Sequence, residues 1–380
     1  MLIWMAMVRI GIVGGGQLAK MMAQEARKLG FEVAVLDPQE KCPACGLADY
    51  KITASFMDGD KIRELAEISD VLTYDIEHVN VKVLKELEEE GYPVYPSPRI
   101  LEVIQDKLVQ MEVMRKARIP VPKFVRADRE ELKEKAREFG FPLVQKTRKG
   151  GYDGKGVMVI KTEEELDKLL PADSMLQEFV NIEKEIAVMV ARDQYGNVEV
   201  YPVVEMVFNE ANILDFLVVP ARIPEDKAEE AQEIAMRVVK ALDGVGIFGI
   251  EMFLDKDGRI LLNEIAPRPH NSGHYTIEAC MTSQFEQHVR AITGLPLGSS
   301  ELLVPAVMFN LLGEGYGKPK VVGLKEALSY PGVYVHVYGK PVVRPLRKMG
   351  HVTVVNKDLE KALEIAHKVK GIIKVVGNGS

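Results

Sequence analysis

The feature that most constrains the fold is a glycine-rich turn between a short strand and an amphipathic helix near the N-terminus. Residues 9–13 are mostly apolar and lead directly into Gly14-Gly15-Gly16-Gln17-Leu18-Ala19. An apolar-periodic helix follows as far as Gly30, and a second strand over residues 31–36 ends at Asp37. This order of strand, glycine turn, helix, strand and acid predicts a doubly wound α/β sheet.

The glycine turn taken alone predicts NAD, because a helix N-terminus offers free N–H groups to an anion. Many doubly wound sheets keep such a turn only for packing between helix and strand, and we favour that packing role. A helix over residues 62–68, a strand over 71–75 and a helix over 81–90 continue the pattern. The strand delivers Glu77 and His78 to its carboxyl end, either as ligand contacts or as solvated loop residues.

Length and composition exclude several classes of protein. A chain of 380 residues is too long for one core and predicts two or three domains. Lys and Arg total 49 against 56 Asp and Glu, and this net charge of −7 argues against a nucleic-acid-coating protein. The apolar stretches are too short to span a membrane, and residues 1–7 lack the basic region and cleavage site of a signal peptide. We therefore expect a cytoplasmic protein.

Cys42 and Cys45 have the CxxC spacing of a redox pair or of half a zinc site. A structural zinc needs four ligands, and the sequence contains no second CxxC. A third and simpler interpretation is that both cysteines are small loop residues, and we favour this one.

A second glycine loop lies between predicted strands over residues 141–146 and 157–160. Four glycines in seven residues, 150–156, let backbone N–H groups close over phosphates, while Lys146 and Lys155 supply positive charge. An ordinary mobile hairpin is the alternative. The basic residues favour phosphate binding.

Two further predicted strands, over residues 249–254 and 258–265, form a hairpin that carries Glu251 and Glu264 among apolar neighbours. A carboxylate on an apolar face is costly unless it is paired or binds a metal, and two carboxylates suit Mg²⁺. The alternative is two edge-strand glutamates in water. The polar loop of residues 266–274 follows at once and suits an oxyanion.

With these motifs the chain resembles the ATP-grasp superfamily and, within it, the family of 5-(carboxyamino)imidazole ribonucleotide synthases. The most specific matches are residues 150–156 and 263–274. Val157 stands where the family often has Gln, and Lys107 where an Arg is common. The resemblance implies a multidomain α/β and α+β fold. Its parts are a Rossmann-like pre-ATP-grasp domain (1–98), an ATP-grasp domain pair (99–298, with a lid over about 120–180) and a small β-rich C-terminal domain (299–380).

The resemblance implies an ATP-dependent ligase of purine biosynthesis. Such an enzyme carboxylates the amine of 5-aminoimidazole ribonucleotide with bicarbonate, through carboxyphosphate, with Mg²⁺ or Mn²⁺, and works as a homodimer. The alternatives are an ATP-grasp ligase with another acceptor, an NAD-dependent oxidoreductase and a non-catalytic nucleotide sensor. The oxidoreductase leaves the second glycine loop and the acidic hairpin unexplained, and the sensor leaves the polar loop unexplained.

The same resemblance assigns site residues. Metal binding falls to Glu251 and Glu264, and catalysis on bicarbonate and the amine to Asp153, Arg268, His270 and Asn271. The residues expected at the ribonucleotide are Gln17, Leu18, Glu77 and Tyr152, with Lys340, Arg347 and Lys348 at its phosphate. Those expected at ATP are Lys107, Lys146, Gly151, Tyr152, Asp153, Gly154, Lys155, Gly156, Glu178, Phe179, Val180, Glu185 and Asn263.

Overall fold

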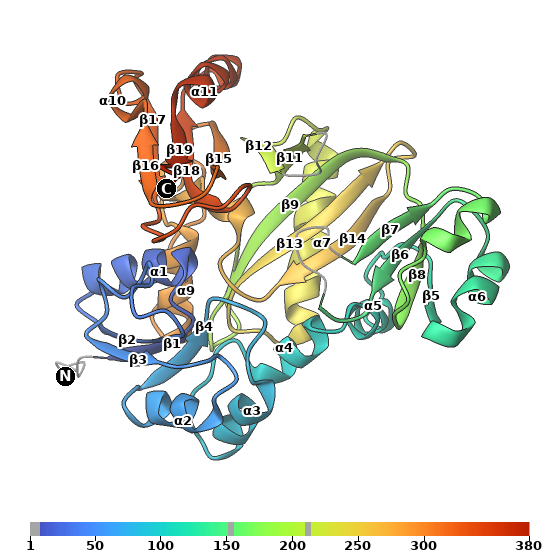
Figure 1. The fold of residues 1–380 in the computed structure, drawn as a ribbon, viewed down its shortest axis with the longest axis horizontal. Coiled ribbons are helices and arrows are strands. Elements are labelled where there is room, and N and C mark those ends of the chain that lie inside the picture. The colour runs from blue at the N-terminus through green and yellow to red at the C-terminus, as the bar shows by residue number, and fades with distance from the viewer. Residues whose placement is uncertain (1–7, 151–155, 210–213, 380) are drawn as a thin grey trace.

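The computed structural model describes residues 8–150, 156–209 and 214–379. Figure 1 shows a blue N-terminal unit, a green unit at the opposite end, a long central sheet between them and an orange-red C-terminal unit. No helix among the described residues is long and apolar enough to cross a membrane.

The N-terminal unit is the doubly wound sheet that the sequence predicts. Its four strands are parallel and ordered β3-β2-β1-β4. Apolar side chains of the first helix pack against those of a helix from much later in the chain, residues Gln284–Ile292. The elements are β1 (Arg9–Val13), α1 (Gln17–Lys28), β2 (Glu32–Asp37), β3 (Tyr50–Thr53), α2 (Gly59–Glu67), β4 (Val71–Tyr74) and α3 (Val81–Glu89).

Two helices, α4 (Pro98–Ile104) and α5 (Lys107–Lys116), follow the N-terminal unit. The break lies at Asp106, whose Oδ1 accepts hydrogen bonds from the N–H groups of Leu108 and Val109. A side chain that caps a helix N-terminus begins a new helix there. Asp106 also pairs with Arg148 at 2.7 Å, which ties this helix start to the following unit.

The green unit in Figure 1 is an antiparallel sheet with the order β5-β8-β6-β7. Its core is small and lies between this sheet and α6. The elements are β5 (Phe124–Ala127), a 3₁₀ turn (Arg129–Glu131), α6 (Leu132–Phe139), β6 (Leu143–Thr147), β7 (Val157–Ile160), a second 3₁₀ segment (Glu163–Lys168) and β8 (Ser174–Glu178).

The central sheet runs in the order β14-β13-β9-β11-β12-β15-β18-β17. Because β12 pairs with β15, the sheet continues past residue 298, and the expected domain bounds stay a prediction. The elements are β9 (Ile182–Arg192), β10 (Val198–Val200), β11 (Val204–Phe208), β12 (Leu214–Val219), α7 (Glu225–Leu242), β13 (Gly246–Asp255), β14 (Ile260–Ala266), a 3₁₀ turn (Asn271–Gly273), α8 (Thr276–Ala279), α9 (Gln284–Ile292), β15 (Ala306–Glu314), β16 (Pro319–Val322), α10 (Leu324–Ala327), β17 (Val333–Val337), β18 (Lys348–Val355), α11 (Leu359–Ile372) and β19 (Lys374–Gly377).

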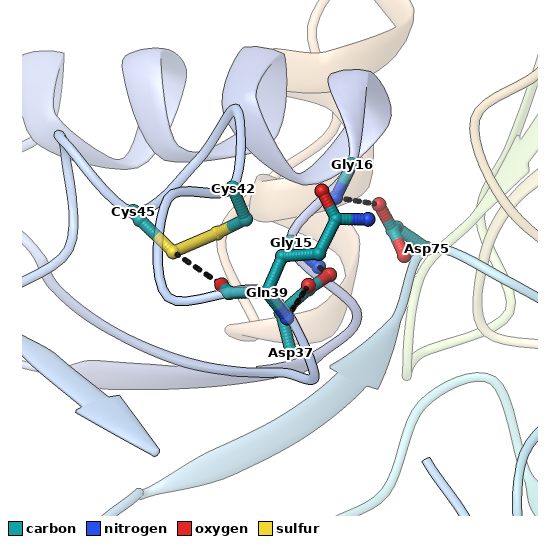
Figure 2. The surroundings of a disulfide bond; sticks show 7 residues. All are labelled: Gly15, Gly16, Asp37, Gln39, Cys42, Cys45 and Asp75. Atoms are coloured by element: carbon teal, nitrogen blue, oxygen red, sulfur yellow. Dashed lines mark hydrogen bonds between the residues drawn. A yellow bond between two sulfur atoms is a disulfide. The ribbon is translucent and has the colours of Figure 1, made fainter. Parts of the chain in front are cut away.

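The first glycine turn is occupied by carboxylates of the protein itself (Figure 2). Asp37 Oδ2 accepts a hydrogen bond of 2.9 Å from the N–H of Gly15, and Asp75 Oδ2 accepts one of 2.8 Å from Gly16. These are the N–H groups that a dinucleotide pyrophosphate would need. Because these N–H groups are already engaged, the turn is no evidence for NAD.

The two N-terminal cysteines correct an expectation. Cys42 and Cys45 form a disulfide, so they are more than two small loop residues. The spacing had allowed a redox pair. It could not show that the loop folds back and brings the two sulfurs together.

Replacing Gly14 with alanine tests how tightly Asp75 closes the turn. Gly14 has a φ of +106°, and a Cβ there would lie 1.7 Å from Asp75 Oδ1. We expect Gly14→Ala to cost at least about 3 kcal/mol and to lower the midpoint of thermal unfolding by about 5 °C or more. The exposed Gly46, with open space around it, supplies the control Gly46→Ala. Equal midpoints for the two variants would contradict this account of the turn.

The pH dependence of stability tests the same carboxylate. Burial raises the pKa of Asp75 to about 6, so the folded chain holds this proton more tightly than the unfolded chain does. The contribution of protonated Asp75 to the free energy of unfolding is therefore complete at about pH 4, and it is lost as the pH rises through about 6. Asp75→Asn keeps an acceptor oxygen and loses the charge, so between pH 4 and 7 it should gain up to about 3 kcal/mol relative to wild type. Urea unfolding of both proteins measures this, and a pH-independent difference would refute it.

Candidate functional site

Charged side chains from four elements meet between the β5–β8 sheet and one end of the central sheet. Lys107, the first residue of α5, lies 3.1 Å from Glu264 Oε1 on β14. Lys146 on β6 donates a hydrogen bond of 2.8 Å to Asn263 Oδ1, and Asn263 Nδ2 lies 3.5 Å from Glu251 Oε2 on β13. The structure thus brings together the predicted metal ligands and the lysines predicted at the ATP phosphates.

A β-bulge explains how neighbouring residues of β14 both serve this cleft. Glu251 pairs with Glu264 and Met252 pairs with Leu262, so Asn263 has no partner of its own on β13. In a regular strand, adjacent side chains point to opposite faces, and an extra residue re-aims one of them. Asn263 reaches Lys146 and Glu251 while Glu264 reaches Lys107.

The burial of the two glutamates agrees only in part with the expectation that both carboxylates lie on an apolar face. The side chain of Glu264 is 48% exposed, so it is not a carboxylate on an apolar face.

 The side chain of Glu251, by contrast, is only 21% exposed. The cost of burial that suggested a metal therefore applies to Glu251 and not to Glu264.

The electrostatics of the cleft follow from this crowding. Burial raises the pKa of Glu251, and the nearby carboxylates of Glu264 and Glu185 raise it further. Burial lowers the pKa of Lys146 to about 8, and the positive charge of Lys107 adds to that effect. Like charges thus lie close together on both sides of the cleft, which suits a ligand that carries charge of both signs.

The residues expected at the adenine lie at the end of β8. Glu178 Oε1 accepts a hydrogen bond of 2.8 Å from the N–H of Lys123, which fixes the carboxylate beside the chain. The ring of Phe179 is 45% exposed, and Val180 is buried in a small cluster with Phe253 and Leu261. Glu185 follows on β9, where burial raises its pKa.

The polar loop after β14 offers hydrogen-bond donors without protein partners. Arg268 pairs with Glu77 at 2.7 Å, yet its Nε is buried without a partner, and so is Asn271 Nδ2. His270 Nε2 lies 3.5 Å from Glu251 Oε1, so the loop adjoins the carboxylate cleft. Burial lowers the pKa of His270 to about 3, and the charges of Arg268 and Lys348 lower it too. Buried donors without partners fit an oxyanion.

Gln284, the first residue of α9, holds this loop in place and was missed by the sequence analysis. Its Oε1 accepts a hydrogen bond of 2.9 Å from the N–H of His270, and its Nε2 donates one of 2.8 Å to the carbonyl of His270. The same Nε2 lies 3.0 Å from His274 Nδ1. A glutamine at a helix start carries no signal of such a role in a single sequence.

Three histidines join the loop to the C-terminal strands. The rings of His274 and His351 lie 4.6 Å apart, and those of His351 and His336 are stacked at 4.4 Å. His336 Nε2 lies 2.6 Å from Glu278 Oε1 on α8. Because His351 belongs to β18, these contacts fix the strand that begins with Lys348.

The predicted phosphate cluster is built from β18 and the segment before it. Lys340 Nζ donates a hydrogen bond of 2.7 Å to the carbonyl of Lys348, and Arg347 Nη1 donates one of 2.8 Å to Val342. Burial lowers the pKa of Arg347, as does the charge of Arg344. These hydrogen bonds therefore bring the segments that carry Lys340, Arg347 and Lys348 close together in space.

A lysine of α1 attaches this cluster to the N-terminal unit. Lys20 Nζ donates hydrogen bonds of 2.9 Å to the carbonyl of Val337 and 3.2 Å to that of Tyr338. Gln17 and Leu18 lie at the start of the same helix. Glu77, expected at the ribonucleotide, is instead engaged by Arg268 here.

Some predicted residues cannot be placed. Gly151, Tyr152, Asp153, Gly154 and Lys155 lie outside the described residues. Gly156 is described, and its carbonyl accepts a hydrogen bond of 2.8 Å from the N–H of Thr147. Among the residues that the structure does describe, no group of three or more His, Cys, Asp or Glu is arranged to hold a metal ion.

Comparison with known domain families covers most of the chain. Residues 7–105 match the ribonucleotide synthetase preATP-grasp domain, residues 112–285 the ATP-grasp domain, and residues 306–365 the phosphoribosylaminoimidazole carboxylase C-terminal domain. These matches confirm the expected fold class of a parallel pre-ATP-grasp sheet, an ATP-grasp domain and a C-terminal domain.

Individual relatives agree with the domain matches. The N5-carboxyaminoimidazole ribonucleotide synthase of Bacillus subtilis is 40% identical over 94% of this chain and 94% of that protein. The crystal structure of the synthetase from Thermotoga maritima has a TM-score of 0.92 and 57% identity, over 98% of this chain and 100% of that one. The Aspergillus clavatus synthase, in complex with ADP and 5-aminoimidazole ribonucleotide, has a TM-score of 0.88 and 33% identity, over 96% of this chain and 98% of that one. The chain therefore belongs to the N5-carboxyaminoimidazole ribonucleotide synthase family of ATP-grasp enzymes.

Proposed function

We propose that this chain converts 5-aminoimidazole ribonucleotide, bicarbonate and ATP to N5-carboxyaminoimidazole ribonucleotide, ADP and phosphate in purine biosynthesis. The observation that carries the proposal is the contact between two arrays of side chains at Glu251. One array, with Glu264 and the two lysines, suits a nucleotide and a cation. The other, with His270 at 3.5 Å from Glu251 Oε1, suits a small oxyanion.

ATP would lie with its phosphates at Lys107 and Lys146 and its adenine beside Phe179. Glu251 and Glu264 would hold Mg²⁺ or Mn²⁺ together with phosphate oxygens. The fit is good, because burial raises the pKa of Glu251 and the neighbouring carboxylates of Glu264 and Glu185 raise it further, and a bound cation would relieve this crowding of negative charge. When bound, the cation neutralises charge on the phosphoryl group in transfer.

Bicarbonate would bind at Arg268, His270 and Asn271. The unpartnered Arg268 Nε and Asn271 Nδ2 would donate to its oxygens. One bicarbonate oxygen attacks the γ-phosphorus of ATP, and ADP leaves, so that carboxyphosphate forms. This intermediate loses phosphate and gives CO₂, which must be kept from water until the amine of the ribonucleotide attacks its carbon. Asp153 remains the predicted acceptor of the proton that the amine loses.

The ribonucleotide would span the N-terminal and C-terminal units. Its phosphate would lie at Lys340, Arg347 and Lys348, and its ribose and base near Gln17 and Leu18. The hydrogen bonds from Lys20 to the segment before Lys340 support this placement, because they hold both groups of residues in one region. A homodimer and a cytoplasmic location stay predictions from the family resemblance and from the sequence.

Omitting each substrate in turn tests the proposed function. Purified protein should release ADP and phosphate from ATP only when both bicarbonate and 5-aminoimidazole ribonucleotide are present, and ¹⁴C from bicarbonate should enter an acid-labile product. Full turnover with another acceptor amine in place of the ribonucleotide would favour the alternative of a different ATP-grasp ligase. NADH-dependent absorbance changes without ATP turnover would contradict both.

Neutralising the carboxylates tests the cation site. We expect Glu264→Gln to abolish turnover and Glu251→Gln nearly so, with the fold intact, because each removes a negative ligand from the cation that would hold the transferring phosphate. Glu183→Gln supplies the matched control, since Glu183 is an exposed glutamate on β9. Near-wild-type turnover of Glu264→Gln in millimolar Mg²⁺ would refute the assignment.

Removing Arg347 tests the phosphate cluster separately from the ATP site. Loss of a charge-assisted hydrogen bond of about 1.5–3 kcal/mol should raise the KM for the ribonucleotide roughly 10- to 150-fold. The KM for ATP should change much less. Arg344→Ala is the control, because Arg344 is an exposed arginine on the same loop. Equal weakening of both substrates by Arg347→Ala, or no change in either, would contradict the assignment.

A further inference from the structure

The disulfide of Cys42 and Cys45 lies directly against the first glycine turn (Figure 2). The N–H of Ala44, between the two cysteines, donates a hydrogen bond of 3.0 Å to the carbonyl of Gly15. A Cβ on Gly15 would lie only 2.4 Å from Cys42 Sγ, so the sulfur packs on the backbone of the turn. The disulfide loop and the turn therefore form one packed unit.

Asp37 also joins the same loop to the same turn. Its Oδ1 accepts a hydrogen bond of 2.8 Å from the N–H of Gln39, and its Oδ2 accepts one of 2.9 Å from Gly15. Gln17 begins α1 two residues after Gly15. A movement of the disulfide loop would thus be passed to the start of α1.

The two sulfurs differ in accessibility. Cys42 is buried, with 7% of its surface exposed, whereas Cys45 is half-buried. Cys45 Sγ lies 3.7 Å from the carbonyl oxygen of Gln39. A disulfide sulfur carries no proton, so this carbonyl can accept a hydrogen bond from Cys45 only after reduction.

We propose that Cys42 and Cys45 form a thiol–disulfide exchange site that controls the affinity of the glycine turn and α1 for the ribonucleotide. The inference rests on the proposed placement of the ribonucleotide at Gln17 and Leu18. In the oxidised state the disulfide fixes the loop against Gly15. In the reduced state the loop is free to move and the turn loses that support.

The exchange needs an external dithiol as reductant. One of its thiolates attacks Cys45 Sγ, the bond between the cysteines breaks, and Cys42 leaves as a thiolate that takes up a proton. The second thiol of the reagent then displaces Cys45, which is protonated in turn. The dithiol becomes a disulfide, and the two cysteines gain two electrons and two protons. An external disulfide reverses the reaction.

Reduction should act on one substrate. Two thiol sulfurs do not remain at bonding distance, and Cys42 has no room to move toward Gly15, so Cys45 must swing away. Because a loosened turn must be ordered again on binding, we expect the KM for the ribonucleotide to rise roughly 3- to 10-fold. The KM for ATP should change less, since Lys107 and Lys146 lie outside this unit.

The test compares oxidised enzyme, enzyme reduced with dithiothreitol and Cys45→Ser in steady-state kinetics. Thiol titration after unfolding should give one thiol, that of Cys280, in the oxidised enzyme and three in the reduced enzyme. We expect Cys45→Ser to show the raised KM of the reduced enzyme and no response to dithiothreitol, and reoxidation of the wild type to restore its KM.

Three outcomes would overturn the exchange site. They are three thiols before and after oxidation, the same ribonucleotide KM in both redox states, and equal changes in the KM values for ATP and the ribonucleotide. Turnover that needs no ribonucleotide in either state would instead refute the proposed function, so the two failures are distinguishable.

Discussion

The structure depends on a cluster of charges in which lysines and carboxylates neutralise one another. Lys107 pairs with Glu264 at 3.1 Å, and Lys146 lies 2.8 Å from Asn263 and within the field of Glu251. These contacts hold α5 and the β5–β8 sheet against β13 and β14. Under the proposed function, ATP with a divalent cation would replace both sides at once, because phosphate oxygens suit the lysines and the cation suits the carboxylates. The protein's own charges thus prepare the cleft for a ligand of mixed charge.

The polar loop of residues 266–274 is held in place by side chains from other parts of the chain. Gln284 fixes both backbone polar groups of His270, and the stacked histidines fix Lys348 relative to the same loop. This leaves buried donors of Arg268 and Asn271 without protein partners. A buried donor without a partner costs free energy in the free protein, and that cost is recovered when an anion accepts from it. Order in the supporting residues would therefore favour binding of bicarbonate at the loop under the proposed function.

The sequence predicted the parts of the fold that depend on local patterns. Apolar periodicity and glycine turns are local, so the doubly wound sheet, the two β6–β7 strands and the β13–β14 hairpin all appear where expected. Glu251 and Glu264 were found because carboxylates among apolar strand residues are visible in one sequence. Lys146 was found because it adjoins the second glycine loop, whereas Lys107 was assigned only through the family resemblance. The family matches confirm the reaction class that these motifs indicated.

Features that depend on tertiary contacts were missed. Asp106 ends one helix and starts another because it caps α5 and pairs with Arg148. The bulge at Asn263 shifts a register that a pattern of period two cannot reveal. Asp75 fills the glycine turn from 59 residues away, and Gln284 holds His270 from a separate helix 14 residues further along the chain. The Cys42–Cys45 disulfide needs a loop that folds back. In each case the partner is distant or the geometry is set by the rest of the fold.

The central claim is that the carboxylate cleft and the oxyanion loop act together to phosphorylate bicarbonate. The most direct measurement follows ¹⁸O from labelled bicarbonate into the phosphate released from ATP by the wild-type enzyme with the ribonucleotide present. If a bicarbonate oxygen attacks the γ-phosphorus, that oxygen stays on phosphorus when the C–O bond of carboxyphosphate breaks. The account predicts one labelled oxygen in each phosphate released. Phosphate that carries oxygen from solvent water alone would contradict it.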